Sequence, residues 1–147
     1  MAIPSKREVD LVIVNPGSRS QVYQSLGTNL AAIEPPVWAA MMATYVRLKG
    51  WSVALLDMNA EATSPEQVAR RVSEMGPLLT AVVVYGHQPS ASTQNMPAAA
   101  AVCTALKEEA ETPTLLVGGH VASLPERTLR EEDADYVSGG EGLQTIK

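Results

Sequence analysis

The sequence has few of the residues and segments that mark several common protein classes. Phe is absent and aromatic residues make up only 4% of the 147 residues, so aliphatic side chains must build the core. Cys103 is the single cysteine, which excludes an intrachain disulfide. No segment approaches the ~20 consecutive apolar residues of a membrane span, and segment 1–10 lacks the apolar run of a signal peptide. We therefore expect a cytoplasmic protein with no membrane partner.

Basic residues are also scarce. The 11 Lys and Arg residues are outnumbered by 16 Asp and Glu residues, which gives a formal net charge of −5. The basic residues form neither a stripe nor a tail, so the electrostatic footprint of a nucleic-acid-binding protein is missing. The acidic stretch 130–135 is interpreted as a solvated helix end. We expect no nucleic-acid partner.

Aliphatic residues are abundant and are arranged in short blocks. Hydrophobic residues reach 46%, the level of a globular domain, and the length fits one domain. Unbroken apolar blocks predict strands buried on both faces, and their alternation with helical segments predicts a parallel sheet. We predict an α/β, flavodoxin-like, doubly wound five-stranded sheet with strand order 2-1-3-4-5. The predicted strands are 9–14, 52–57, 79–85, 114–117 and 135–137.

The first connection between strands is predicted to hold a long loop and a helix. Segment 18–34 has no clear period, and loops of such length inside a domain are usually functional or mobile. The helix is predicted to open at Pro35-Pro36 and to end at Gly50, where a left-handed cap is expected. Its predicted apolar face, read from helical spacing, comprises Val37, Met41, Thr44, Tyr45 and Leu48.

Two capping boxes mark the starts of later helices. Ser64 with Gln67 predicts one helix, and Ser123 with Glu126 predicts a short helix over 125–130. In each box a Ser hydroxyl would accept a hydrogen bond from a backbone N–H three residues on.

Ligands of doubly wound sheets bind beyond the carboxyl ends of the strands. Both histidines and most of the glycine-rich backbone follow predicted strand ends, and glycine lets a large ligand approach the main chain closely. The segment 86–94 is predicted to be a polar loop. The candidate site residues are Asn15, Pro16, Tyr85, Gly86, His87, Gln88, Ser90, Ser92, Gly118, Gly119, His120, Gly140 and Glu141.

Three common ligand sites of related folds are excluded. The segment after the first strand, 15–20, does not match the dinucleotide pattern Gly-x-Gly-x-x-Gly, and no P-loop motif is present. A phospho-acceptor receiver domain would need a carboxylate pair after the first strand and an Asp at the end of the third. Asn15 and Tyr85 stand at those places.

The blocks 11–16, 56–61, 84–86, 116–120 and 140–142 resemble, in order and spacing, the cobalamin-binding domain of cobalamin-dependent radical SAM methyltransferases. The shared features are a strand ending in Asn-Pro, a Gly-Gly pair after the fourth strand and a final Gly-Glu-Gly. The resemblance implies that residues 1–147 are a cobalamin-binding domain, with a radical SAM domain of the same chain beyond residue 147. In such an enzyme, SAM would methylate cob(I)alamin, and the methyl group would pass to carbon of a peptide or natural-product substrate.

The resemblance also implies roles for single residues. Asn15 and Pro16 would lie under the lower face of the corrin. Ser90 or Ser92 would hydrogen-bond the nucleotide tail, although both are equally N-cap candidates for the next helix. The Gly-Gly pair would line the passage of the tail or form only a turn after a strand. Glu141 would contact the cofactor or cap a turn.

Two departures from related families limit this assignment. Cobalamin-dependent mutases carry Asp-x-His-x-x-Gly after the first strand, and its His ligates cobalt; this sequence has no such motif. We therefore expect base-off cobalamin without a histidine ligand, with His87 and His120 as wall residues or ordinary loop residues. One buried Cys103 cannot hold the [4Fe-4S] cluster that a full-length enzyme needs beside SAM, so the chain alone is not expected to be catalytic.

Two alternatives remain open. The chain could be a stand-alone corrinoid carrier, although such carriers usually keep the Asp-x-His-x-x-Gly motif. It could also be a flavodoxin-like sensing or interaction domain without a catalytic role. Trp38 would belong either to the core or to a partner interface.

Overall fold

A computed structural model describes residues 8–17, 33–86 and 89–147. Within these residues, parallel strands form one sheet in the order β2-β1-β3-β4-β5, which confirms the predicted order. The strands are β1 (Leu11–Asn15), β2 (Val53–Asp57), β3 (Leu79–Val84), β4 (Thr114–Gly118) and β5 (Tyr136–Val137). With helices on both faces, this sheet has the flavodoxin-like fold.

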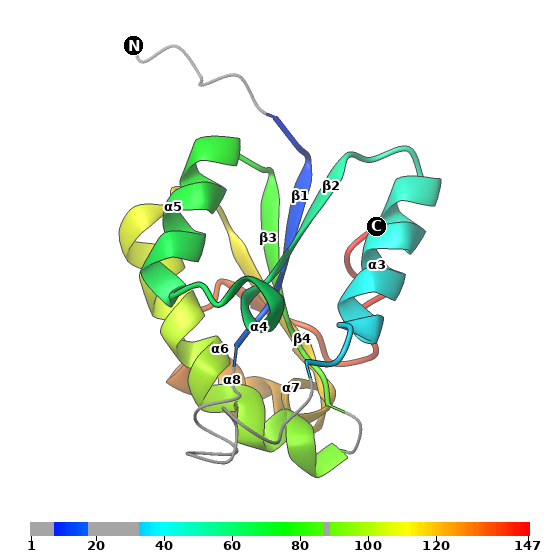
Figure 1. Ribbon diagram of the computed structural model, residues 1–147. Coiled ribbons are helices and arrows are strands. Elements are labelled where there is room, and N and C mark those ends of the chain that lie inside the picture. Colours follow the sequence, from blue (N-terminus) through cyan, green and yellow to red (C-terminus); the bar gives the residue numbers. More distant parts are fainter. Residues whose placement is uncertain (1–7, 18–32, 87–88) are drawn as a thin grey trace.

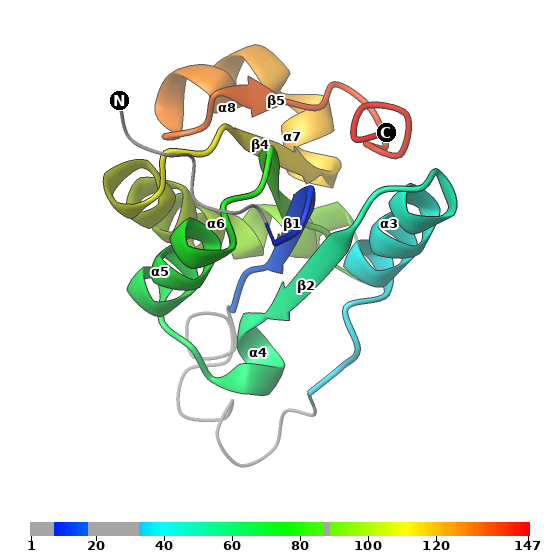
Figure 2. The same cartoon turned by 90° about the horizontal axis from the view of Figure 1, so that it is seen from above.

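The two faces of the sheet are covered by different helices (Figures 1 and 2). Helix α3 (Val37–Leu48) and the C-terminal residues cover one face, whereas α5 (Pro65–Met75) and α6 (Pro89–Glu109) cover the other. Three shorter helices follow strand ends or link them: α4 (Met58–Glu61), α7 (Gly119–Ser123) and α8 (Pro125–Glu131).

Alternate residues of each strand feed two apolar layers. Val12 and Val14 belong to the layer under α5 and α6, whereas Leu11 and Ile13 belong to the layer under α3. Because side chains of successive strand residues point to opposite faces, a strand covered on both faces must be apolar throughout. This explains the unbroken apolar blocks of the sequence.

The capping box at the start of α5 is confirmed. The backbone N–H of Gln67 donates to Ser64 Oγ at 3.3 Å, and the Ser64 N–H donates to Gln67 Oε1 at 2.8 Å. Gly76 ends the helix in the left-handed conformation with φ +57°. Gly50, beyond α3, likewise has φ +95°.

The predicted apolar face of α3 is wrong. Val37, Met41 and Leu48 are exposed, and the buried residues are Ala39, Met42, Ala43 and Val46. Both sets repeat with helical spacing, so periodicity alone could not choose between them. The structure buries the set that contains Ala39 and Ala43 with Met42 and Val46, and Val37, Met41 and Leu48 stay exposed.

The predicted loop over 86–94 is also wrong in its second half. Helix α6 begins at Pro89 and continues through Pro97 to Glu109. Proline inside a helix removes a backbone hydrogen bond and usually breaks the helix; the sequence accordingly predicted a helix only over 98–110, after Pro97. Pro89, in contrast, stands in the first helical turn, where proline is favoured.

The predicted capping box of α8 is absent. The N-cap residue is Leu124, and no side chain caps the helix. Ser123 instead donates its hydroxyl hydrogen bond to the carbonyl of Gly119 at 2.8 Å, because it completes the last turn of α7, a helix that the sequence patterns did not predict.

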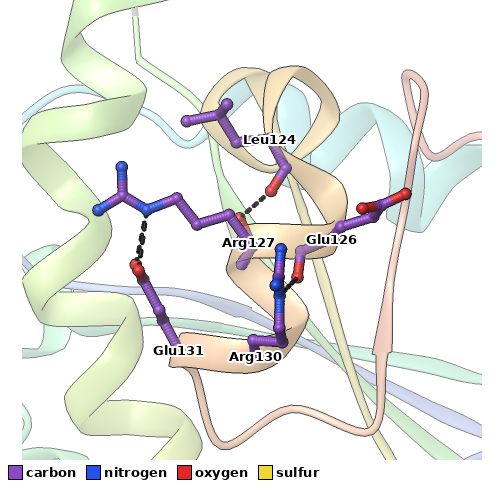
Figure 3. A network of polar contacts seen from close by, with 6 residues as sticks. Leu124, Glu126, Arg127, Arg130 and Glu131 are labelled. Carbon is purple, nitrogen blue, oxygen red and sulfur yellow. Dashed lines mark hydrogen bonds and ion pairs between the residues drawn. The ribbon is translucent and has the colours of Figure 1, made fainter.

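Helix α8 carries local side-chain contacts, but none of them accepts a hydrogen bond from a backbone N–H of its first turn (Figure 3). Thr128 Oγ1 donates to the Leu124 carbonyl at 2.9 Å, and Arg130 Nε donates to the Glu126 carbonyl at 3.1 Å. Arg127 forms an i,i+4 ion pair with Glu131 at 2.9 Å on the exposed side. Such surface pairs contribute about 0.3–0.5 kcal/mol each, so packing holds α8 in place.

The residues after β5 return across the sheet to α3. Ile146 is buried in the layer under α3, and Leu143 packs against the same layer. The turn requires Gly142, which has φ +85°, and a Cβ there would lie 2.3 Å from Val117 Cγ1. The C-terminal residues are therefore part of the core and lie beside α3 (Figure 2).

Replacing Gly142 tests this close approach. Gly142→Ala should lower the free energy of unfolding by about 1–2 kcal/mol for the left-handed backbone and about 1–3 kcal/mol for the overlap with Val117. Gly50→Ala is the matched control, because Gly50 has a similar φ and a Cβ there would meet no atom within 4 Å. Denaturant unfolding measures both; equal losses would contradict the packing of the C-terminal turn.

Candidate functional site

The carboxyl ends of β1 and β3 form the switch point of the sheet. The chain leaves β1 toward α3 on one face, and it leaves the adjacent strand β3 toward α6 on the other face. In open α/β sheets, ligands bind in the crevice outside such a point. The carboxyl ends lie at the bottom of Figure 1, where α4 and α7 begin.

Asn15 and Pro16 are tied to the end of β2. Asn15 Nδ2 donates to Asp57 Oδ1 at 2.9 Å, and the same oxygen accepts from the backbone N–H of Asn59 at 3.1 Å. Asn59 Nδ2 in turn reaches the Pro16 carbonyl at 3.4 Å. Asp57 is thus the N-cap of α4, a role that its place before a helix-forming segment could have indicated.

Ser92 joins three elements from a buried position. Its hydroxyl donates to the Val84 carbonyl at 2.5 Å and accepts from the backbone N–H of His120 at 3.0 Å. The residue is only 1% exposed. Its proton is therefore committed to the end of β3, and Ser92 fixes the start of α7 relative to α6.

The two glycines after β4 have different surroundings. A Cβ on Gly118 would lie 2.1 Å from the Val84 carbonyl oxygen, so no larger residue fits there. A Cβ on Gly119 would meet its nearest neighbour, Ser92 Cβ, at 3.7 Å, an ordinary contact. Packing explains the first glycine, whereas the second leaves backbone open at the strand end. Gly86 resembles the first, since a Cβ there would lie 2.2 Å from Ala91 Cβ.

His120 is held by the first turns of α6. Its Nδ1 lies 3.0 Å from Thr93 Oγ1, and its backbone N–H is bound by Ser92. His87 and Gln88 lie outside the described residues. Ser90 lies within the first turn of α6, and its side chain is not described.

Tyr85 links the end of β3 to the turn after β5. Its hydroxyl donates to the Glu141 carbonyl at 3.2 Å. Burial, and then the negative charge of Glu141, raise the pKa of Tyr85, so the phenol keeps its proton at neutral pH. The ring stacks on Trp38 of α3, with ring centroids 4.8 Å apart and planes inclined by 24°.

The turn after β5 presents open backbone. A Cβ on Gly139 or Gly140 would meet no atom within 4 Å. Ser138 is buried, and its hydroxyl donates to the Gly140 carbonyl at 3.2 Å. The carboxyl edge thus carries bare peptide backbone at two places, Gly119 and 139–140.

We also searched the described residues for a pocket, a metal-ligand cluster and a membrane-spanning helix away from this edge. A pocket of about 320 Å³ lies at the opposite end of β4, beside Lys107, which is paired with Asp133 at 2.6 Å. No group of three or more His, Cys, Asp or Glu residues gathers within the described part of the chain. No helix in residues 33–86 or 89–147 is long and apolar enough to cross a bilayer.

Comparison with known families and structures agrees with this geometry. A family model described as the B12 binding domain matches residues 23–147, and the chain therefore belongs to the B12-binding domain family. No curated protein sequence matches the chain.

Solved structures share the fold at low sequence identity. The radical S-adenosylmethionine methyltransferase TsrM from Kitasatospora setae, with tryptophan substrate and a SAM analog bound, matches with TM-score 0.70 and 16% identity over 92% of this chain. The cobalamin-dependent radical enzyme OxsB, with aqua-cobalamin and S-adenosylmethionine bound, matches with TM-score 0.60 and 15% identity over 94%. This chain spans only 24% of the first protein and 18% of the second.

The described edge fits a large, flat cofactor. Bare backbone at Gly119 and 139–140 leaves space where side chains would otherwise stand, and glycine backbone permits close approach of a ligand. The edge is also internally rigid, since the Ser92, Asp57 and Tyr85 hydrogen bonds tie its segments together.

Removing the Ser92 hydroxyl should destabilise the fold. Ser92→Ala leaves the Val84 carbonyl and the His120 N–H without their partner in a buried place, which costs about 1–3 kcal/mol per group left unpaired. Ser123→Ala, which removes an exposed hydroxyl bond to Gly119, should change stability by less than about 0.5 kcal/mol. Thermal unfolding measures the stability of both variants. Equal stability of the two would contradict the role of the Ser92 hydroxyl in joining β3, α6 and α7.

Cys103 should be chemically silent in the folded chain. The residue is fully buried on α6, together with Ala99 and Leu106 of the same helix. Burial first, and then the charges of Glu132, Asp133 and Asp135, raise the pKa of its thiol to about 12. At about pH 8, near the pKa of a free thiol, a disulfide reagent should label the folded chain only as fast as it unfolds. Rapid native-state labelling would contradict this burial.

Proposed function

We propose that this chain binds cobalamin at the carboxyl edge of its sheet and serves as the cobalamin module of a radical SAM methyltransferase. The family match over residues 23–147 carries the proposal. The open glycine backbone at the edge supports it independently, because glycine lets a large ligand approach the main chain closely.

The residues at the carboxyl edge have different roles in the proposed cobalamin site. Gly119 and Gly140 offer backbone surface, and Asn15 with Pro16 lies under the lower corrin face. Ser92 acts indirectly, since its proton is committed to Val84 and its role is to position the start of α7. The hydrogen bond to the nucleotide tail then falls to Ser90.

We expect the bound cobalamin to be base-off with no histidine on cobalt. The segment after β1 begins Asn15-Pro16-Gly17 and supplies no imidazole. His120 is on α7, and its Nδ1 is engaged by Thr93. When bound, cobalamin supplies a cobalt centre that accepts a methyl group from SAM and passes it on; the protein contributes orientation and control of the axial positions.

The remaining chemistry needs residues outside this chain. The similar solved proteins are four to five times longer by the fractions covered, and one TsrM structure is described with cobalamin and a [4Fe-4S] cluster bound. Cys103 is buried and single, so a radical SAM domain would supply the cluster and SAM site. The final acceptor would be a carbon of a peptide or natural product, and the enzyme would act in the cytoplasm.

Reconstitution with hydroxocobalamin tests the proposal. The purified chain is mixed with the cofactor and desalted, and the visible spectrum of the protein fraction is recorded. We expect stoichiometric retention with a base-off spectrum. After one-electron reduction in vitro, electron paramagnetic resonance should show cobalt lines without splitting by an axial nitrogen.

A matched pair of variants locates the site. Gly119→Val fills the open backbone at the end of β4 and should weaken retention by about tenfold or more, a loss of roughly 1.4 kcal/mol. Ala101→Val adds the same side chain to the exposed side of α6 and should bind as the parent does. Circular dichroism checks that both are folded.

The outcomes discriminate between the candidate functions. A folded chain that retains no corrinoid would overturn the cobalamin proposal and favour a sensing or interaction domain. A nitrogen-split cobalt signal that disappears in His120→Ala or His87→Ala would overturn the histidine-free assignment while leaving cobalamin binding intact. Equal retention by Gly119→Val and Ala101→Val would move the site away from β4.

A further inference from the structure

The stacked pair of Trp38 and Tyr85 lies beside the candidate site. Trp38 is in the first turn of α3, which starts at the carboxyl edge because it follows β1, and Tyr85 directly follows β3. The Tyr85 hydroxyl donates to the Glu141 carbonyl, next to the open backbone of Gly140. The pair is therefore continuous with the glycine turn and closes the α3 side of the switch point.

Trp38 exposes apolar surface that the fold itself does not use. Its side chain remains 42% exposed although one ring face is stacked. The core contacts of α3 are made by other residues, Ala39, Met42, Ala43 and Val46. Val37 and Met41 beside it are 56% and 43% exposed. Large exposed apolar groups that cluster in this way mark contact surfaces.

The position and chemistry of the pair favour a ring-shaped ligand. Two stacked aromatic rings are a rigid surface that loses little entropy on contact, and Tyr85 is fixed by its bond to Glu141. An indole packs well against methyl-edged conjugated rings and can donate its Nε1–H to an amide. A corrin offers both methyl groups and amide side chains at its periphery.

We propose that Trp38, supported by Tyr85, is a cofactor-contact residue that packs against the rim of the corrin; this rests on the proposed cobalamin function. Tyr85 is a positioning residue in this arrangement: it holds the indole and joins it to the glycine turn. Neither side chain ligates cobalt.

Trp51 provides a matched control. It is the only other tryptophan of the sequence, it is 45% exposed, and it precedes β2 at the amino edge of the sheet. The two tryptophans thus have nearly equal exposure at opposite ends of the strands. If cobalamin protects one tryptophan and not the other, the difference comes from their positions in the fold and not from the residue type.

The first measurement is oxidative footprinting of the unaltered chain. Trp38 and Trp51 should be oxidised to similar extents in the cofactor-free chain. With hydroxocobalamin bound, Trp38 should be protected while Trp51 stays reactive, as read by mass spectrometry of the peptides. Protection of Trp38 that instead grows with protein concentration, without cofactor, would assign the surface to a second copy of the chain and overturn the inference.

The second measurement is the affinity of variants. Trp38→Ala should weaken hydroxocobalamin binding by about tenfold or more, the effect of losing an aromatic contact in a ligand site, whereas Trp51→Ala should bind as the parent does. Tyr85→Phe keeps the stack but loses the bond to Glu141, and should weaken binding less than Trp38→Ala. Far-UV circular dichroism verifies the fold of each variant.

These results separate the inference from the proposed function. If the parent chain retains cobalamin but Trp38 stays reactive and Trp38→Ala binds normally, the contact is wrong and the cobalamin function stands. If the parent chain retains no cobalamin, both fall together. Selective protection of Trp38 with weakened binding by Trp38→Ala supports the contact.

Discussion

The hydroxyl of Ser92 is the contact on which the carboxyl edge depends. It lies between the Val84 carbonyl and the His120 N–H, so it sets the end of β3, the first turns of α6 and the start of α7 at once. Gly118 completes the junction, because only a residue without Cβ can pass so close to the Val84 carbonyl. Buried polar groups must be paired, and this one pairing fixes three segments whose backbone forms part of the candidate cofactor surface.

The rest of the edge is assembled around that junction from distant parts of the sequence. Asp57 joins the ends of β1 and β2 through Asn15, and Tyr85 joins the end of β3 to Glu141. Among the residues that the structure describes, these side chains are engaged with one another, and open surface remains on the backbone at Gly119 and 139–140 and on Trp38. Polar side chains that hydrogen-bond one another, beside open backbone, suit a cofactor that carries the reactive centre itself.

The sequence was sufficient for the sheet but not for the helix surfaces. The strands followed from apolar blocks because strands buried on both faces are apolar throughout, and their order followed from the alternation of strands with helices that is typical of a doubly wound sheet. The Ser64 box was predicted correctly because its signal is local. The predicted apolar face of α3 was wrong because two sets of residues share the same period, and only the packed structure shows that Ala39, Met42, Ala43 and Val46 are the buried set. The first turns of α6 were predicted as loop because Pro97 lies inside the helix. The predicted cap of α8 by Ser123 was wrong because the Ser123 hydroxyl donates to Gly119 within α7. The candidate site residues were predicted as positions that follow strands, whereas the hydrogen bonds of Ser92 and the stacking of Trp38 depend on tertiary contacts that the sequence does not show.

The return of the C-terminal residues to α3 has a consequence for the order of assembly. Strands β1 to β4 precede the C-terminal turn in the chain, although a domain generally folds as a unit. The partner of Tyr85, however, is Glu141, and the turn at Gly142 is seated against Val117. The edge is therefore completed only when residues 141–142 have docked against Tyr85 and Val117, and a ligand meets the complete edge only after that step.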